Sequence, residues 1–310
     1  MSVSEEQALR LLNDRNIQEQ VKVEDLLGVA AGGRPVALLV CPADFPDGER
    51  MRQSIDEGFN RRYYGGSRRG GIGGLFDRVR YSVMRATMNP LRYKASLLRE
   101  SYEEAIFDHP NYRAHRRWAS ELGLQLYERQ LRPSLDEIYV IREQSTVGEV
   151  AALMVRREQI RREMLEEISQ GDRPRMVFMP EERSPEYLER LGRLLSYPEC
   201  CVAAYIDDVT GRVDSALRAS NQLAEVSGDL EPTAYFAGAF FPCSPRCEAA
   251  RVMGARILEA LAGIDDRIGE RMLRVFAANM RYVSRYPEVL KRRRQQMISK
   301  YMGEDADEER

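Results

Sequence analysis

The chain has 310 residues, of which 43% are hydrophobic and 31% are charged, and its formal net charge is -2. This length suits one large domain or two ordinary ones, and either would contain a substantial core. The near-neutral charge excludes a strong overall electrostatic preference for nucleic acid or membranes, and the composition excludes a disordered or fibrous protein.

The first residues of the chain do not resemble a secretory signal, because they are acidic and lack an apolar core. The longest apolar run near the start, residues 26–40, is broken by a Gly-Gly-Arg-Pro segment and is too short to span a bilayer. We therefore expect a cytoplasmic protein without a membrane partner. Because thiols stay reduced there, the five cysteines are not expected to form a disulfide framework.

The first half of the chain predicts several helices and two short strands. The apolar spacing predicts helices over these segments: 1–31, 44–60, 75–88, 93–106, 112–131 and 147–168. Runs rich in β-formers predict strands at residues 35–41 and 137–141. Between the second and third helices, the Gly/Arg-rich segment 61–74 is expected to be a loop.

The second half also predicts a mainly helical structure. A serine cap at Ser184 with Pro185 in the first helical position predicts a helix start. Further elements are expected at these positions: strands over 176–179 and 235–241, and helices over 247–262 and 266–284. The charged residues from Lys291 onward are expected to fray.

We predict an α+β fold that is predominantly helical with a small sheet. Gly171 and Pro174 end the last helix of the first half, so we place a domain boundary there. The expected parts are residues 1–170, a cysteine-containing domain over 171–302, and a charged tail over 303–310. No internal repeat of solenoid length is present.

The second half contains two cysteine segments, residues 197–201 and 242–247, and each includes a Pro-x-Cys sequence followed by a helical pattern. Pro198 places Cys200 and Cys201 in a first helical turn, and Ser244 with Pro245 does the same for Cys247. The positive end of a helix dipole favours the thiolate, which is the form that binds metal or attacks electrophiles. If the two helix starts face each other, up to four sulfur atoms converge.

Three interpretations of these cysteines remain open: metal or Fe–S ligation, metal-free thiol redox chemistry, and small buried side chains. The Cys243-x-x-x-Cys247 spacing is wider than that of a zinc ribbon, and adjacent cysteines are awkward for one tetrahedral zinc. A cluster accepts adjacent ligands more easily because it offers several irons. We expect an Fe–S cluster or zinc, with these ligands: Cys200, Cys201, Cys243 and Cys247. The fifth cysteine, Cys41, is expected in the core.

The region from about Ser184 to Leu261 resembles an uncharacterised protein family found mainly in archaea. In that family a leucine-rich helix leads into Y-P-x-C-C, and P-C-S-P-x-C opens a later helix. The matching segments here are Tyr197–Cys201 and Pro242–Cys247. The resemblance implies that the two motifs belong to one unit, and it implies no particular activity.

A basic segment offers an alternative function. From Arg61 to Arg99 there are ten basic residues and one acid, Asp77, and five aromatic residues are interspersed. A Gly/Arg-rich loop with aromatic residues can hold phosphates and stack on bases. The candidate residues for nucleic acid or a phosphate ligand are Arg61, Arg62, Tyr63, Tyr64, Arg68 and Arg69. The competing interpretation is a solvated basic face whose charges pair with acids elsewhere.

The remaining candidates are acids and histidines. Glu199 and Glu248 lie beside the cysteines and are candidate acid or base groups, or simply favourable charges at helix starts. His109 and His115 are the only histidines, and surface or capping positions are expected for both. Their scarcity argues against a catalytic triad based on histidine.

Overall fold

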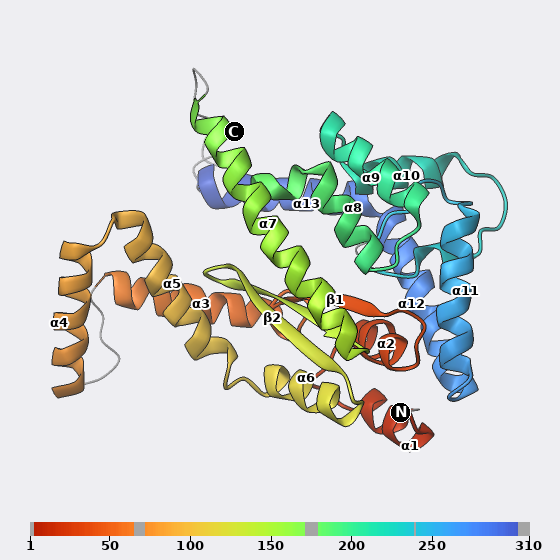
Figure 1. Ribbon diagram of the computed structural model, residues 1–310, viewed down its shortest axis with the longest axis horizontal. Coiled ribbons are helices and arrows are strands. Elements are labelled where there is room, and N and C mark those ends of the chain that lie inside the picture. Colours follow the sequence, from red (N-terminus) through yellow and green to blue (C-terminus); the bar gives the residue numbers. More distant parts are fainter. Residues whose placement is uncertain (1–2, 65–71, 171–178, 239, 303–310) are drawn as a thin grey trace, which may run out of the picture. The chain divides into compact units, whose positions relative to one another are not determined.

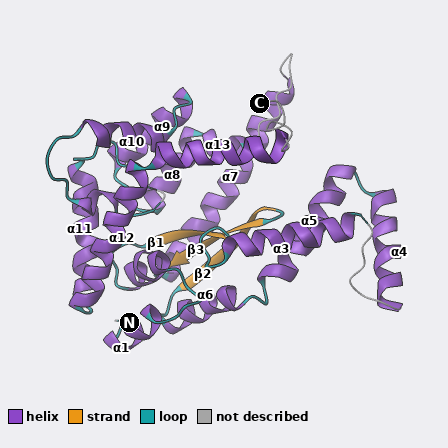
Figure 2. Ribbon diagram, turned by 180° about the vertical axis from the view of Figure 1, so that it is seen from behind, coloured by secondary structure: helices purple, strands orange, loops and turns teal. Residues whose placement is uncertain are grey.

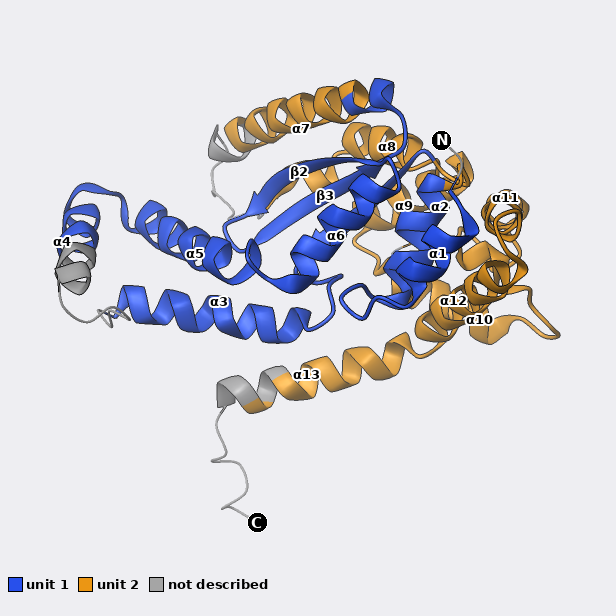
Figure 3. Ribbon diagram, turned by 90° about the horizontal axis from the view of Figure 1, so that it is seen from below, with its two compact units in different colours: residues 1–30, 35–147 blue, residues 31–34, 148–310 orange. Residues whose placement is uncertain are grey.

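The computed structural model describes residues 3–64, 72–170, 179–238 and 240–302 (Figure 1). The described chain is predominantly helical with a small antiparallel sheet, so the predicted α+β class is confirmed. The chain divides into two compact units (Figure 3): unit 1 contains residues 1–30 and 35–147, and unit 2 contains 31–34 and 148–310. The boundary expected near residue 171 stays a prediction, because residues 171–178 lie outside the described residues.

Unit 1 is built on a three-stranded sheet, coloured orange in Figure 2. Its strands are β1 (Val36–Cys41), β2 (Gln125–Arg132) and β3 (Leu135–Ile141). The order is β1-β3-β2 and both pairings are antiparallel, so the apolar strand β3 is central and almost entirely buried. The strands predicted at 35–41 and 137–141 are therefore confirmed.

The helix predicted over 112–131 is wrong in its second half. Helix α6 (Pro110–Glu121) ends early, and β2 follows it and lies beside it (Figure 1). The residues of β2 favour a helix individually, but their backbone groups pair with β3, where Tyr127 lies opposite Tyr139. As an edge strand β2 is largely exposed, so it lacks the strong apolar pattern of a buried strand.

The other helices of unit 1 surround this sheet or extend from it. They are α1 (Glu5–Leu12), the π-helix η1 (Val21–Leu27), α2 (Gly28–Ala30), α3 (Gly48–Tyr63), α4 (Ile72–Thr87) and α5 (Pro90–Ile106). Helix α3 packs along α5, where a Cβ on Gly58 would lie 3.1 Å from Ser101 Cβ. The loop predicted over 61–74 is shorter at both ends, and its centre, 65–71, lies outside the described residues.

Unit 2 is helical throughout its described part. Its helices are α7 (Gln144–Gln170, which begins in unit 1), α8 (Pro185–Leu194), α9 (Glu199–Gly211), α10 (Ser215–Glu225), α11 (Glu248–Ala262), α12 (Asp266–Ser284) and α13 (Tyr286–Met302). Two short 3₁₀ helices, η2 (Pro180–Arg183) and η3 (Pro232–Tyr235), connect them. No described helix is both long enough and apolar enough to cross a membrane.

One expectation for unit 2 is wrong. The described residues of the apolar segment 235–241 form no strand: Tyr235 ends η3, and the side chain of Asn279 donates to the carbonyl of Tyr235 at 3.1 Å. Helix α11 approaches η3 so closely that a Cβ on Gly254 would lie 2.0 Å from Thr233 O. Residues 291–302 of the charged stretch belong to helix α13, and residues 303–310 lie outside the described ones, so the expected fraying stays a prediction. The strand predicted at 176–179 falls mostly on residues outside the described ones.

Candidate metal centre

The first cysteine segment is held by the junction of α8 and α9. Ser184 accepts a hydrogen bond from Tyr187 N at 3.4 Å and Pro185 begins α8, as predicted. After α8 the chain turns through Ser196, whose φ of 58° is left-handed, and Pro198 caps α9. Cys200 and Cys201 therefore lie in the first turn of α9, as the sequence predicted.

Close packing fixes the direction of α9 against α8. A Cβ on Gly192 of α8 would lie 2.5 Å from Cγ2 of Val202, which directly follows Cys201. Only glycine at position 192 lets the two helices approach to this distance, since real Cβ contacts this short essentially never occur. The position of Cys201 thus depends on Gly192, which has no side chain and cannot act as a ligand.

The second segment forms a turn before its helix. The N–H of Cys247 donates to Ser244 O at 3.1 Å, and α11 begins at Glu248 with Cys247 as its N-cap. The expectation that Ser244 caps the helix and Cys247 lies in its first turn is therefore wrong by one turn. The backbone of Cys247 is extended, with ψ of 111°, as is usual for an N-cap residue.

The four sulfur atoms converge, as predicted. The Sγ of Cys247 lies 3.7 Å from that of Cys200 and 3.6 Å from that of Cys201, and the Cys200 and Cys201 sulfurs are 3.9 Å apart. With Cys243 included, all four sulfur atoms lie within 4.8 Å of one another. This spacing is compatible with metal binding.

The four thiols differ in their exposure to solvent. Cys201 and Cys247 are buried, Cys243 is partly buried, and Cys200 is exposed. The N–H of Cys243 donates to Cys201 Sγ at 3.4 Å, which joins the two segments directly. The group is therefore closed on the protein side and opens to solvent at Cys200.

The thiols also differ in acidity. Burial opposes ionisation of Cys247, but the backbone N–H of Ala250 and the neighbouring thiols outweigh it and lower the pKa. Burial raises the pKa of Cys201, and burial together with the Cys247 thiolate raises the pKa of Cys243 to about 11. The lowering of thiol pKa that was predicted for a first helical turn agrees with Cys247 and not with Cys201, because Cys201 is buried and lies beside other thiols that disfavour a second negative charge.

Helix α10 supports the cysteines from the protein side. Arg218 donates from Nη1 to the carbonyls of Pro242 and Cys243 at 3.2 and 3.4 Å, and Gln222 donates to Cys243 O at 3.1 Å. Arg218 Nε also pairs with Asp208 of α9 at 2.8 Å. The sequence did not reveal these contacts, because Arg218 and Gln222 lie far from every cysteine along the chain.

The acidic candidates do not join the sulfur atoms. Among the described residues, the cysteines are the one group with metal-ligand spacing. Glu248 forms an ion pair with Arg251 at 2.8 Å, and Asp208 pairs with Arg218. Glu199 lines a separate cavity between α8 and α9. Acid or base roles for Glu199 and Glu248 stay predictions.

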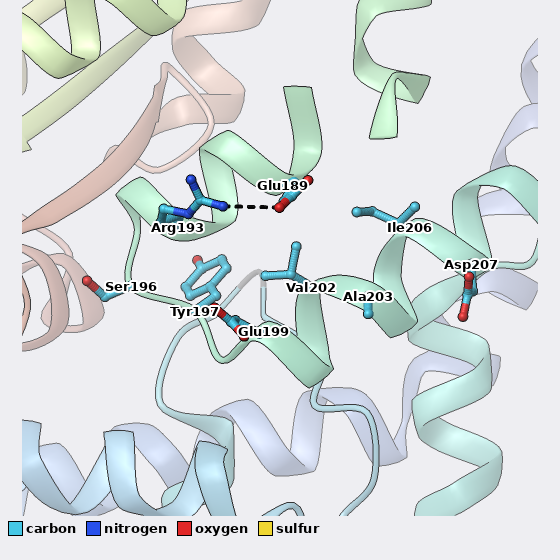
Figure 4. A pocket seen from close by; sticks show the side chains of 9 residues that line it. All are labelled: Glu189, Arg193, Ser196, Tyr197, Glu199, Val202, Ala203, Ile206 and Asp207. Atoms are coloured by element: carbon cyan, nitrogen blue, oxygen red, sulfur yellow. Dashed lines mark hydrogen bonds and ion pairs between the residues drawn. The ribbon is translucent and has the colours of Figure 1, made fainter. Parts of the chain in front are cut away.

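That cavity, of about 590 Å³, lies on another face of α9 (Figure 4). Glu199, Val202 and Ile206, at helical spacing, line one wall. On the side of α8, Arg193 forms an ion pair with Glu189 at 3.1 Å. Cys200 and Cys201 do not line this cavity, so it is separate from the cysteine group.

Much of the basic segment in unit 1 is neutralised within the chain. Arg62 pairs with Glu104, Arg80 pairs with Glu100 at 2.8 Å, and Arg99 binds Asp136. These pairs agree with the interpretation of a basic face matched by acids.

The other candidate residues of the basic segment differ in their exposure and in their surroundings. Tyr63 stacks on Phe59, and Tyr64 is 79% exposed. Arg61 lies beside Arg62 in the last turn of α3, whereas Arg68 and Arg69 lie outside the described residues. Binding of nucleic acid or phosphate stays a prediction.

The two histidines have structural positions. His109 caps α6 by accepting from Asn111 N at 3.2 Å, in line with the predicted capping role. His115 is 2% exposed and stacks on Phe45 at 3.9 Å, so a surface position is wrong for it. Cys41 is fully buried in β1, as predicted, and burial raises its pKa to about 12.

Comparison with known proteins gives a family match over part of the chain and no activity. No solved structure matches the chain. An uncharacterised protein of Methanocaldococcus jannaschii is 33% identical over 64 residues, which cover 19% of this chain and 34% of that protein. The chain thus spans about a third of the length of the curated relative that it matches. The expected resemblance to an uncharacterised family is confirmed over a wider region: residues 124–266, which include both cysteine segments, match the model of a protein family of unknown function (DUF483).

Proposed function

We propose that this chain binds one transition-metal ion, zinc in the first place, through the thiolates of its two cysteine segments. The observation that carries the proposal is the spacing of the sulfur atoms. A Zn–S bond of about 2.3 Å in a tetrahedral site places the sulfurs about 3.8 Å apart. The three distances among Cys200, Cys201 and Cys247 are 3.6, 3.7 and 3.9 Å.

The same spacing favours a single ion over an Fe–S cluster. In a four-iron cluster each thiolate binds a different iron, and the iron–sulfide body separates the sulfur atoms. Such a site would hold its cysteines farther apart than a site with one ion. Adjacent cysteines were expected to be awkward ligands for one zinc, but the sulfurs of Cys200 and Cys201 are 3.9 Å apart, a spacing that suits two corners of one tetrahedral site.

The surroundings favour the negative charge of such a site. Four thiolates around a divalent ion carry a net charge of minus two, which burial disfavours. The N-terminal ends of α9 and α11, the N–H of Cys243 on Cys201 Sγ, and the guanidinium of Arg218 near Cys243 O all oppose this charge.

The test is metal analysis of the full chain purified under anaerobic conditions without chelators. We expect one zinc per chain, no acid-labile sulfide and no visible absorption. Replacement of zinc by Co²⁺ should give the absorption bands of a tetrahedral thiolate site, because Co²⁺ adopts the same geometry with coloured d–d transitions.

Serine variants identify the ligands. Cys201→Ser and Cys247→Ser should each lower metal content and change the Co²⁺ spectrum. Cys41→Ala is the matched control, since this thiol is buried in a strand of unit 1 and belongs to no cluster. Metal-free protein, or brown protein with sulfide and several irons per chain, would contradict the single-ion proposal.

A further inference from the structure

We infer that Cys200 is the site of oxidative modification in this chain, and that a peroxide links it to Cys247 and releases the bound ion. The inference rests on the proposed metal site. It adds a reaction that the site undergoes, the thiol that reacts first, and the partner that completes the disulfide.

Exposure selects Cys200 as the first thiol to react. It is the exposed member of the four, whereas Cys201 and Cys247 are buried and Cys243 is partly covered. Oxidation of a cysteine requires access as well as thiolate character, and metal coordination supplies thiolate character to all four sulfurs alike. Exposure to solvent is therefore the property that distinguishes the four thiolates.

Distance and covalent geometry select Cys247 as the partner. Its sulfur lies 3.7 Å from that of Cys200, and a disulfide shortens this distance to about 2.05 Å. Cys201 is nearly as close, at 3.9 Å, but a bond between neighbouring residues closes a small ring around one peptide unit. Such a ring strains the planar peptide bond and the first turn of α9.

The reaction proceeds in two steps. The Cys200 thiolate attacks hydrogen peroxide, so an S–O bond forms, the O–O bond breaks, and the departing hydroxide takes a proton to become water. The thiolate of Cys247 then attacks the sulfur of the sulfenic acid, the S–S bond forms, and a second hydroxide leaves and is protonated. Two electrons pass from the two sulfurs to the peroxide, and two water molecules are formed.

Loss of the ion follows from the bond that is made. The disulfide removes two of the four thiolate ligands at once, and a neutral disulfide sulfur is a poor ligand for zinc. The two remaining thiols, Cys201 and Cys243, stay joined by the N–H of Cys243. A thiol reductant with zinc should therefore restore the original site.

The experiment uses the zinc-loaded full chain, treated with hydrogen peroxide and followed with a coloured zinc indicator. Samples taken during the reaction are alkylated and digested with trypsin. Cleavage after arginine separates three peptides: 194–212 with Cys200 and Cys201, 219–246 with Cys243, and 247–251 with Cys247. We expect a cross-link between peptides 194–212 and 247–251, formed at the rate of zinc release. Fragmentation should place it at Cys200.

Variants separate reactivity from metal binding. In Cys200→Ser, peroxide should release zinc at least about tenfold more slowly than in the wild type, because the remaining thiols are covered. Cys201→Ser should still form the Cys200–Cys247 cross-link, and Cys41→Ala should react like the wild type. If Cys200→Ser holds no zinc, the peptide map of the wild-type chain decides alone.

Three outcomes would overturn the inference: zinc release with a cross-link at another pair, zinc release with none, and no zinc release at all. The proposed function fails in a different way. Zinc content is measured before peroxide is added, so a chain without zinc contradicts the metal site and the release step together. The peptide map of that chain still tests whether Cys200 reacts first and pairs with Cys247.

Discussion

Arg218 of α10 and Asp208 of α9 form an ion pair in which Nε and Oδ2 are 2.8 Å apart. The same guanidinium donates to the carbonyls of Pro242 and Cys243, so one side chain connects the helix that carries the first cysteine pair with the loop that carries Cys243. Both charged groups are largely buried, which strengthens their interaction relative to a surface pair.

We predict that Arg218→Gln lowers metal affinity by about 10- to 100-fold, the usual effect of removing a group that orients a metal ligand. Arg218→Lys should retain the charge but lose the forked geometry, and it should recover only part of the affinity. Competition with a chelator of known affinity measures the change, and the Co²⁺ spectrum reports any distortion. Arg251→Gln is the control, because its side chain forms exposed pairs with Glu231 and Glu248 and donates to no carbonyl of the cysteine segments.

A second prediction concerns the packing of α8 on α9. Gly192→Ala should destabilise unit 2 by about 1–3 kcal/mol and weaken metal binding, because the new methyl group overlaps Val202 and displaces the start of α9. The double variant Gly192→Ala with Val202→Ala should recover much of both losses.

Gly148→Ala is the matched control for this pair, since a Cβ there meets nothing within 4 Å. It should leave metal binding unchanged and stabilise α7 slightly, as expected for alanine in a helix. Chemical unfolding followed by circular dichroism, with a metal titration of each variant, measures both properties. Equal behaviour of the variants at positions 192 and 148 would contradict the packing argument.

A third prediction concerns the pH dependence of unit 1. Burial lowers the pKa of His115 to about 4, from the usual 6.5 of a histidine in water. The unfolded chain therefore binds this proton at a higher pH than the folded chain. The contribution of neutral, buried His115 to the free energy of unfolding is therefore fully present above pH 6.5. It is lost as the pH falls toward 4, and the total loss is about 3 kcal/mol.

The single tryptophan, Trp118, lies on the same helix as His115 and donates to Asp14 at 2.8 Å, so its fluorescence reports unfolding of unit 1. Urea unfolding between pH 4 and 7 should lose most of its pH slope in His115→Asn. His109→Asn should keep most of that slope, because asparagine also caps a helix. An unchanged slope in His115→Asn would show that other groups determine it.

A fourth prediction separates structural from exposed arginines in the basic segment. Arg62 donates to Tyr81, Ser101 and the carbonyl of Gly58, and it pairs with Glu104, so it joins α3, α4 and α5. Arg62→Gln should lower the stability of unit 1 by about 1–3 kcal/mol. Arg61→Gln, at a position with no hydrogen-bond or ion-pair partner among the described residues, should be close to neutral.

The same two variants can be tested for nucleic-acid binding by fluorescence anisotropy at several salt concentrations. Binding through phosphates should weaken steeply with salt and should be reduced by Arg61→Gln. No binding at low salt would exclude the alternative function of the segment.

The sequence predicted elements well where burial and local signals agreed. Ser184 with Pro185 marked a helix start, and the short apolar run at 36–41 marked a strand. Prediction from the sequence failed where the structure of a segment depends on contacts with residues that are distant along the chain. The charged strand β2 exists because β3 pairs with it, and Tyr235 and Phe236 are buried without any strand, with Asn279 of α12 donating to the carbonyl of Tyr235.

The candidate metal centre could likewise be predicted only in its local features. Cysteines beside prolines could be recognised one by one, because their chemistry is local, and their convergence followed from two expected helix starts. The support from Arg218 and Gln222 could not be recognised, since it depends on the turn between α9 and α10. The tight approach of Gly192 to Val202 also depends on tertiary packing.

Cys200 and Cys247 are separated by 47 positions along the chain. A cross-link that closes a loop of this length stabilises a protein chiefly by restricting its unfolded chain, by about 4 kcal/mol in the chain-entropy model. An ion held by sulfurs from both segments closes the same loop, which contains α9, α10 and η3. The proposed metal centre would therefore also be a folding element, because an ion bound there would restrict the unfolded chain across more than a quarter of unit 2.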